Sequence, residues 1–565
     1  MDLKWIVLDD ADDGNIYDLA REMNVPLIIA QILWRRGVNS VADAKKFFRA
    51  TIDQLYDPFL IKDMANGVER LRKAILSNQK ILIYGDYDVD GITSVSLLYL
   101  LLKELGATIE YYIPDRQQEG YGLSEKGIRR ASELGVNLIV TVDCGITGHA
   151  EIALATTLGI DVIVSDHHEP AADLPKAIAV IDPKRADCSY PFKELAGVGV
   201  SYKLAQGLLI RMDIDLSILE KYVELVAIGT AADIVPLIDE NRIFVKNGLE
   251  RLNDSDNIGL KTLITAAGLH GKDIGTGQIV FIIAPRINAV GRMGDAERAV
   301  KLLTTDNESE ARDIAEVIES ENRHRKSVDE ETFNGALFLA EDQFKMGRTH
   351  SLVLHKENWH TGVIGIVASR IVEKYYRPTV LISVEDGVGK ASARSIQGFD
   401  LYESLKECED LLLGYGGHKY AAGLSIDKNN IEIFRDRFED IARKKLTEDL
   451  LIPKLQIDAE IQLSQINDKF VDLLKKFAPF GPHNMRPVFV SRKLQIVGTP
   501  VIVGRNHLKF KVRQDNTVLD VIGFNMGELF YRLSPGESNL DLAYVIEEND
   551  YMGRTTIQLR AKDLR

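Results

Sequence analysis

The sequence predicts a multidomain α/β protein that contains a doubly wound parallel sheet. Short β-branched runs alternate with helical stretches in the first half of the chain, which is typical of parallel strands joined by helices. The chain has 565 residues, too many for one hydrophobic core. Its last part contains short alternating strands separated by turn residues, which indicates a small β-barrel.

The first elements fall into a helical segment and a sheet domain. Residues 1–70 form a predicted helical lead-in, and residues 71–307 form the first α/β domain. Helical patterns cover 92–105 and 124–134. The buried strands of the sheet are predicted at 81–84, 108–113, 138–142, 162–165 and 179–181.

Three further regions follow in order. A charged stretch rich in Glu and Arg predicts a helical connector at 308–345. A second α/β domain is expected at 346–450. An OB-like β-barrel is expected at 451–565, where turn residues separate the strands.

Composition narrows the class of protein but not its activity. The chain is 45% hydrophobic and 27% charged, as in an ordinary globular protein. Its longest apolar run, 95–102, is too short for a membrane span, which needs about 18 residues. The N-terminus lacks a signal-peptide pattern, so we expect a cytoplasmic protein without membrane contacts.

Cysteine content and charge exclude some functions. The three cysteines form no CxxC motif, which argues against a thiolate metal site or a disulfide framework. The net charge of −15 argues against a generally basic surface but is compatible with a local basic groove.

Three carboxylates follow the first predicted strand at alternate positions, Asp86, Asp88 and Asp90. Alternate residues of an extended chain face the same side, so these groups can converge. Such crowding of like charges is unfavourable without a cation. Acidic turns are also common on surfaces, so this motif alone fits a metal site and a surface turn about equally well.

The next strand ends add matching residues. Asp143 follows the strand at 138–142, and Asp166, His167 and His168 follow the strand at 162–165. A lone His pair is more often a polar turn, but the carboxyl ends of parallel strands share one crevice. Oxygen ligands with imidazole and no sulfur favour Mn²⁺ or Mg²⁺ over structural zinc. Two such ions would support phosphoester hydrolysis.

The Asp-x-Asp-x-Asp turn and Asp166-His167-His168 resemble the signature of the DHH phosphoesterases. Further motifs resemble the RecJ branch of that family, and the similarity extends from about residue 81 to the C-terminus. These motifs lie at 114–116, 119–122, 197–199 with Lys203, 232–237, and 284–289 with 291–292.

The resemblance implies a set of catalytic and metal-binding residues. His168 would lie next to the scissile phosphate, and Asp143 would bridge two divalent cations, Mn²⁺ in preference to Mg²⁺. Asp233 is assigned by its motif alone, because by pattern it only ends a helix at 218–232. The implied metal ligands are Asp86, Asp88, Asp90, Asp143, His167 and Asp233.

The resemblance also implies phosphate and DNA contacts. The segments 389–395 and 413–423 resemble the DHH-associated DHHA1 substrate-binding module. A GxGG turn alone is more often a tight loop, but nearby cations favour binding of a phosphate or a 5′ end. The implied contacts are Arg116, Tyr121, Arg286, Asn288, Arg292, Ser392, Arg394, Gly416, Gly417 and His418.

A basic strand is predicted near the C-terminus. Arg505, Lys509, Lys511 and Arg513 occupy odd positions. The even positions 508, 510 and 512 hold the apolar residues Leu, Phe and Val. A solvated charge ladder would give the same pattern. On an OB-like barrel, however, such a face is a usual platform for single-stranded nucleic acid.

One motif departs from the family pattern. His483 and Met485 flank Asn484, where the family usually has glycine and proline. A residue with a Cβ is less free than glycine to take a positive φ. The geometry of this junction therefore cannot be inferred from the motif.

The resemblance implies a 5′→3′ exonuclease that degrades single-stranded DNA to 5′-mononucleotides in repair and recombination. A single-strand-binding protein and a helicase are the expected partners. One alternative is a DHH phosphodiesterase of cyclic dinucleotides or short oligoribonucleotides, but such enzymes generally lack this barrel. A second is an inactive scaffold of a replication complex, although such proteins tend to lose metal ligands and every expected ligand is present here.

Overall fold

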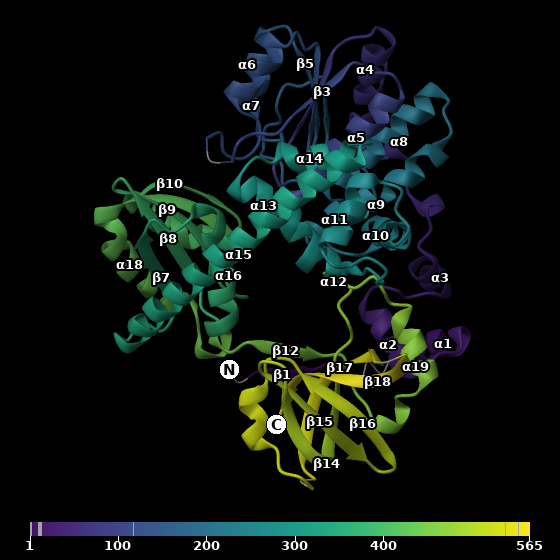
Figure 1. Cartoon of the computed structure of the whole chain (residues 1–565), viewed down its shortest axis with the longest axis vertical. Helices are drawn as coiled ribbons and strands as arrows, with labels where there is room; N and C mark the ends of the chain where they lie inside the picture. Colours follow the sequence, from purple (N-terminus) through teal and green to yellow (C-terminus); the bar gives the residue numbers. More distant parts are fainter. Residues whose placement is uncertain (1–2, 9–13, 117, 537, 552) are drawn as a thin grey trace.

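A computed structural model describes residues 3–8, 14–116, 118–536, 538–551 and 553–565. Parts of the predicted N-terminal segment, residues 1–2 and 9–13, lie outside this range. Figure 1 shows one lobe at the top, a second α/β lobe at the left and a barrel at the bottom. The helix α15 (Glu308–Lys345) runs from the first lobe to the second, where the sequence predicts a helical connector.

The first lobe contains a parallel sheet in the order β3-β2-β4-β5-β6, which confirms the predicted fold class. Strand order reverses between β2 and β4, and ligands of such sheets bind at this switch point. The strands and their connecting helices are β2 (Ile81–Gly85), α5 (Val89–Glu104), β3 (Ile109–Tyr112), α6 (Glu125–Glu133), β4 (Leu138–Val142), α7 (His149–Thr157), β5 (Asp161–Ser165) and β6 (Ala179–Ile181).

Helices cover both faces of this sheet. Alternate strand residues point to opposite faces, and because both sets of side chains are apolar, both faces are buried against helices. Ile81 and Ile83 belong to a core that includes residues of α4 (Met64–Leu76) and α5. Leu82 and Tyr84 belong to a second core, on the side of α6 and α7. The strands are therefore buried on both sides, as their continuous apolar runs predict.

Further helices complete the first lobe. They are α8 (Gly197–Met212), η3 (Leu216–Tyr222), α9 (Val223–Ala232), α10 (Asp239–Leu252), α11 (Ile258–Ala266), α12 (Thr276–Gln278), the π-helical η4 (Ile279–Ile283), α13 (Ala284–Met293) and α14 (Glu297–Thr304).

The second lobe is a mixed sheet in the order β10-β11-β9-β8-β7, with helices packed against it. Only β7 and β8 run parallel. Its elements are β7 (Leu352–Glu357), α16 (Thr361–Tyr375), β8 (Thr379–Glu385), β9 (Val388–Arg394), α17 (Leu401–Lys406), η5 (Glu409–Leu411), β10 (Leu412–Gly417), β11 (Ala421–Asp427), η6 (Lys428–Asn430) and α18 (Ile431–Lys445).

The C-terminal part contains a closed barrel, as the sequence predicts. Strands β14, β15, β16, β18 and β17 pair in that order, and β17 pairs back onto β14. The elements are η7 (Glu448–Leu451), β12 (Lys454–Ile457), β13 (Ala459–Glu460), η8 (Leu463–Gln465), α19 (Asp468–Lys475), β14 (Phe489–Val503), β15 (His507–Gln514), β16 (Thr517–Gly523), η9 (Gly527–Arg532), β17 (Leu540–Tyr551) and β18 (Arg554–Leu564).

The N-terminal segment packs against the barrel, and it contains a strand as well as helices. Strand β1 (Lys4–Val7) pairs in parallel with β12, and residues of α2 and α3 belong to the barrel core. The helical elements of this segment are α1 (Gly14–Met23), α2 (Leu27–Arg35), α3 (Val41–Arg49), η1 (Ile52–Gln54) and η2 (Pro58–Leu60). Across the described ranges, no helix combines the length and apolarity needed to cross a bilayer.

Candidate metal centre and nucleic-acid interface

The carboxyl ends of β2, β4 and β5 deliver acidic and imidazole groups to one place. Asp86 and Asp88 follow β2, Asp143 follows β4, and His167 lies two residues after β5. Asp86, Asp143 and His167 are each no more than 5% exposed. The structure thus brings together the residues that the sequence placed at three separate strand ends.

Two of the carboxylates also organise helix N-termini. Asp88 is the N-cap of α5, and its Oδ1 accepts the backbone N–H groups of Asp90 (2.9 Å) and Gly91 (3.1 Å). Asp90 accepts the N–H groups of Gly197 (2.7 Å) and Val198 (2.8 Å) at the start of α8. These bonds stabilise the turn after β2. They use both oxygens of Asp90, each of which keeps a second lone pair, and only Oδ1 of Asp88.

His167 lies at the centre of the cluster. Its Nε2 is 3.1 Å from Asp143 Oδ1, 3.7 Å from Asp233 Oδ2 and 3.8 Å from Asp90 Oδ2. Asp233 caps the C-terminal end of α9. The fold therefore brings Asp233 to the same cluster from a distant part of the chain.

The ligand atoms form three overlapping groups, and within each group they lie within 4.8 Å of one another. The first is Asp86, Asp88 and Asp143, the second is Asp90, His167 and Asp233, and the third is Asp143, His167 and His168. Asp143 joins the first two groups through its contact with His167. Asp143 Oδ1 and His167 Nε2 are buried and face each other at 3.1 Å without forming a hydrogen bond, and Asp86 Oδ1 is buried without a partner among the described residues. Buried polar atoms are normally paired, so these atoms fit a site for divalent cations.

Electrostatics lead to the same conclusion. Burial and repulsion from Asp88 raise the pKa of Asp90 to about 7. Burial and neighbouring carboxylates also raise the pKa of Asp143 and of Asp233. Burial lowers the pKa of His167 to about 3, so its imidazole is neutral and able to bind a metal. The cluster cannot ionise fully at neutral pH without nearby positive charge.

His168 lies at the open side of the cluster. Its Nδ1 is 2.7 Å from Asp166 Oδ1, and the Tyr121 hydroxyl is 3.1 Å from the same ring nitrogen. Burial opposes the charged form, but the Asp166 carboxylate outweighs it and the pKa of His168 rises to about 9. His168 is therefore a cation at neutral pH, unlike His167.

Asp166 has a role that the sequence did not assign. It is buried, and its Oδ1 accepts the N–H group of His167 (2.7 Å) while its Oδ2 accepts that of Ile146 (2.9 Å). It thereby fixes the loops after β4 and β5 and orients His168. Its position inside the motif was the available signal, but the motif does not distinguish a ligand from a supporting residue.

Four arginines from different parts of the chain, Arg116, Arg292, Arg325 and Arg394, lie close enough to interact. Burial and repulsion from Arg116, Arg325 and Arg394 lower the pKa of Arg292 to about 10. The Arg116 guanidinium is 5.2 Å from the centroid of the Tyr87 ring, in the turn between the metal-site residues Asp86 and Asp88. This cationic cluster therefore borders the carboxylate cluster, and Arg325 belongs to it although the sequence did not single it out.

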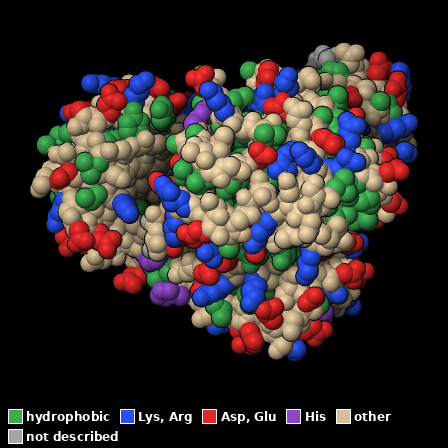
Figure 2. Space-filling model, turned by 90° about the horizontal axis from the view of Figure 1, so that it is seen from above, with side chains coloured by type: hydrophobic (Ala, Val, Ile, Leu, Met, Phe, Trp, Pro, Cys, Tyr) green, Lys and Arg blue, Asp and Glu red, His purple; other side chains and the backbone are tan. Residues whose placement is uncertain are grey.

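The second lobe supplies part of this cationic cluster. Arg394 ends β9, and its Nη1 donates to Ser392 Oγ (3.0 Å). Arg292 donates to the carbonyl of Gly362, at the start of α16 (3.2 Å). In Figure 2, seen from above, a recess separates the second lobe from the rest of the molecule. Basic and acidic side chains are interspersed over that face, so positive charge is local, as the net charge requires.

Arg286 and Asn288 lie elsewhere on α13. The Arg286 guanidinium donates to Glu319 Oε2 (2.7 Å) and to the Ile282 carbonyl (2.8 Å). Asn288 is partly buried. Arg286 therefore links α13 to α15 through its bond to Glu319. A contact of Arg286 with DNA stays a prediction.

The glycine-rich segment forms the exposed edge strand β10. Gly416 and Gly417 are exposed, and the His418 N–H donates to the Ala421 carbonyl (2.8 Å). Gly417 has φ +137°, and a Cβ there would lie 2.5 Å from the Ala421 oxygen. Glycine is thus required for the turn itself, and the backbone beside it is accessible to a ligand.

The basic strand is β15, and its burial alternates as predicted. Lys509, Lys511 and Arg513 are exposed, while the residues between them are buried in the barrel. Arg505 lies in the turn before the strand. Lys511 Nζ is 3.7 Å from Asp520 on β16, so this cation is partly compensated.

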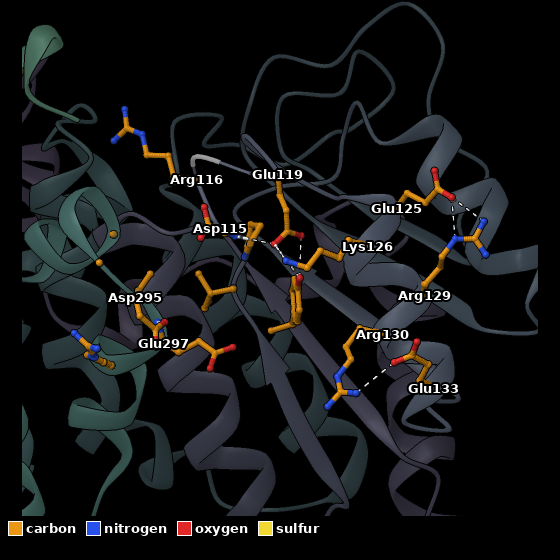
Figure 3. A pocket seen from close by; sticks show the side chains of 17 residues that line it. Asp115, Arg116, Glu119, Glu125, Lys126, Arg129, Arg130, Glu133, Asp295 and Glu297 are labelled. Carbon is orange, nitrogen blue, oxygen red and sulfur yellow. Dashed lines mark hydrogen bonds and ion pairs between the residues drawn. The ribbon is translucent and has the colours of Figure 1, made fainter. Parts of the chain in front are cut away.

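A cavity of about 1160 Å³ is lined by residues of β3 and the loop after it, of α6 and of the α13–α14 turn. Figure 3 shows Glu125 and Arg129 paired on α6, and Arg130 with Glu133, while Arg116 projects at one end. Arg116 is the site residue that this cavity shares with the cationic cluster.

Comparison with protein families matches three regions of the chain. Residues 80–230 match the DHH family, N-terminal domain, and residues 348–444 match the DHHA1 domain. Residues 457–563 match the RecJ OB domain.

Two curated relatives are similar over nearly the whole chain. The single-stranded-DNA-specific exonuclease RecJ of Bacillus subtilis is 39% identical over 99% of this chain and 70% of its own length. That of Escherichia coli is 34% identical over 96% of each chain.

Solved structures show the same relationship. The crystal structure of RecJ in complex with Mn²⁺ from Thermus thermophilus is 29% identical, with a TM-score of 0.86, over 100% of this chain and 79% of that one. A structure of exonuclease RecJ bound to manganese is 36% identical, with a TM-score of 0.60, over 68% of this chain and 95% of that one. Fold, domain order and sequence identity agree, and the chain belongs to the RecJ family of single-stranded-DNA-specific exonucleases.

Proposed function

We propose that this chain hydrolyses single-stranded DNA in the 5′→3′ direction and releases 5′-mononucleotides, with two divalent cations bound. The observation that carries the proposal is that two largely buried ligand groups, Asp86–Asp88–Asp143 and Asp90–His167–Asp233, are joined by the contact of Asp143 with His167. Related structures are described in complex with Mn²⁺ and with Mg²⁺, and the oxygen-rich donor set suits both ions. We expect Mn²⁺ to support activity best.

Each ligand group would hold one ion. Asp86, Asp88 and Asp143 form one group, and Asp90, His167 and Asp233 form the other, with Asp143 shared. When bound, two such ions activate water and neutralise charge on the reacting phosphoryl group. The protein keeps the donors in place through the backbone bonds to Asp88 and Asp90, so little rearrangement is needed on binding.

His168 would contact the scissile phosphate. Its imidazolium is fixed by Asp166 and lies beside the Tyr121 hydroxyl, on the accessible side of the cluster. A cation held in this place stabilises negative charge that develops on the phosphoryl oxygens. Asp166 supports this by orienting the ring and favouring its protonated form.

The cationic cluster would bind the 5′-terminal phosphate. Arg116 and Arg292 come from the first lobe and Arg394 from the second, with Ser392 as a further donor. Guanidinium groups bind phosphate through paired hydrogen bonds. A terminal phosphate held beside the metal centre would place the first phosphodiester bond at the cations. This would account for the proposed 5′→3′ direction of hydrolysis.

The remaining predicted contacts would hold the strand beyond the active site. The exposed basic face of β15 suits a phosphate backbone, and Gly416, Gly417 and His418 lie on an accessible edge strand. We propose that the protein works in the cytoplasm, on ends opened by a helicase and covered by a single-strand-binding protein.

The test uses a long single-stranded oligonucleotide labelled at either end, with Mn²⁺ present. We expect the 5′ label to be released first, as a mononucleotide, and a 5′-phosphate to be preferred over a 5′-hydroxyl. Arg394→Ala should weaken that preference about tenfold or more, since a charge-assisted hydrogen bond contributes roughly 1.5–3 kcal/mol. Earlier release of the 3′ label, or preference for a dinucleotide, would contradict the proposal.

A further inference from the structure

A turn of the C-terminal part contacts the loop that follows Asp233. The Leu237 N–H donates to the Pro482 carbonyl (2.8 Å), and Thr276 Oγ1 donates to the Phe480 carbonyl (2.7 Å). Gly481 packs closely on Leu237, because a Cβ at Gly481 would lie 2.5 Å from the Leu237 Cδ1. The contact lies four residues beyond the metal-site residue Asp233.

The turn itself is held rigidly by Asn484. Gly481 and Asn484 exchange backbone hydrogen bonds (3.2 and 2.9 Å). Asn484 is fully buried, and its Nδ2 donates to the Phe477 (2.8 Å) and Pro479 (2.7 Å) carbonyls, while its Oδ1 accepts from Arg36. The amide side chain therefore fixes the whole segment from α19 to the turn.

Arg242 of α10 anchors the same segment to the catalytic lobe. It is 2% exposed and donates to the Phe477 (2.8 Å) and Ala478 (2.8 Å) carbonyls, and to the Phe47 carbonyl (2.9 Å). The turn is thus attached to the first lobe on two sides, through Arg242 and through Leu237.

The loop at 233–237 needs such support. Ile234 has φ +62°, a conformation that a β-branched residue adopts at a cost of about 1–2 kcal/mol. Its side chain is 63% exposed, so burial of that side chain does not hold it there. Asn241 Nδ2 donates to the Pro236 carbonyl (3.1 Å), and Leu237 is bonded to the turn. The strained residue directly after Asp233 is therefore kept in place from its C-terminal side.

We propose that Asn484 is a positioning residue for the metal centre. Through the turn at 481–484 it fixes the loop at 233–237, and with it the carboxylate of Asp233 beside His167. The C-terminal part then has a task in addition to DNA contact, since it completes the geometry of one ligand. This inference rests on the proposed role of Asp233 as a metal ligand.

The test measures Mn²⁺ affinity of the full chain by calorimetry, together with the steady-state kinetics of DNA cleavage. Asn484→Ala should weaken Mn²⁺ binding about 10- to 100-fold, as loss of outer supporting groups does in other metal sites. The kcat should fall and the KM for DNA should change little. Thr276→Val is a milder second variant that removes one bond to the turn, and about fivefold weaker binding is expected from it.

Two control variants separate the positioning role of Asn484 from general destabilisation and from a wrong assignment of Asp233 as a ligand. Ser491→Ala removes a buried barrel hydroxyl bonded to Ile461 (2.6 Å) and Tyr544 (2.7 Å), so it should lower thermal stability without changing Mn²⁺ affinity. Asp233→Asn should weaken Mn²⁺ binding, and if it does not, the ligand assignment itself is wrong.

The positioning role is overturned by either of two results. In the first, Asp233→Asn weakens Mn²⁺ binding but Thr276→Val and any folded Asn484→Ala protein bind it like the wild type. In the second, Ser491→Ala weakens binding as much as they do. If Asn484→Ala does not fold, Thr276→Val decides the question.

Discussion

Asp143→Asn should change stability in opposite directions with and without metal. Asp143 is buried, its Oδ1 has no hydrogen-bond partner in the described structure, and it belongs to the acidic group with Asp86 and Asp88. In the metal-free protein this carboxylate is therefore a source of repulsion, and the amide should be better tolerated. With Mn²⁺ bound, the same carboxylate should be the ligand that contributes most to the stability of the folded protein.

The magnitude follows from the separation of the charges. The ligand oxygens of the three residues lie within 4.8 Å of one another. Two unit charges at that distance repel by roughly 3 kcal/mol at an effective dielectric constant of about 20. Burial and neighbouring carboxylates raise the pKa of Asp143 above its unfolded value, so metal-free stability should fall as the pH rises above about 4. The Asp143→Asn variant should lack the part of this pH-dependent loss of stability that comes from ionisation of Asp143.

Thermal unfolding with chelator or with Mn²⁺, at pH 5 and pH 8, measures these effects. We expect Asp143→Asn to be more stable than the wild type by up to roughly 3 kcal/mol at pH 8 with chelator. Stabilisation by Mn²⁺ should be largely lost, and so should DNA cleavage. Asp173→Asn, an exposed change in the same lobe, is the control. A metal-free variant less stable than wild type, with Mn²⁺ stabilisation retained, would refute the reasoning.

Three further changes test the energetics of the fold. Lys203→Met should destabilise the fold by about 3–5 kcal/mol in denaturant titration, because Lys203 and Glu240 form a fully buried ion pair (2.7 Å) and Glu240 would lose its cation. Adding Glu240→Gln should restore part of the loss, since the neutral amide needs no cation and its oxygen can still accept from Tyr56 or Tyr190; no restoration would argue against the ion-pair explanation. His483→Gly should stabilise by about 1 kcal/mol, since His483 has φ +59°, and an unchanged unfolding midpoint would count against strain at this residue. Burial raises the pKa of Glu224 to about 7, so as the pH rises the carboxyl ionises in the unfolded chain before it does in the folded protein, and stability falls between about pH 4 and 7. Glu224→Gln should remove this fall and be up to about 3 kcal/mol more stable than wild type at pH 8. An equal dependence of stability on pH in both proteins would contradict this.

The sheet and most of the site could be predicted because their signals are local. A buried run such as 138–142 followed by Asp143 contains both the strand and the position of its polar end. The strand ends then meet because parallel sheets place their carboxyl ends at one edge. The alternation of β15 was equally visible, since burial in a strand follows a period of two.

Other features depend on contacts between distant residues and left no local signal. Asp233 follows a helix, and only the fold brings it within 3.7 Å of His167. The bond of Arg286 to Glu319 and the bond from the Ile146 N–H to Asp166 are likewise tertiary contacts. His483 takes the positive φ that the family motif assigns to glycine, so the turn is kept although its residue has changed.

The pairing of β1 with β12 sets an order for folding during synthesis. Lys4 pairs with Lys454, and residues of α2 and α3 complete the barrel core. At about 5–20 residues per second, the ribosome needs roughly 20–90 s to reach the partner of the first strand. During that time these N-terminal helices lack the surface against which they pack. This N-terminal segment is made well before its partner strand and should therefore be among the last parts to become protected from proteases.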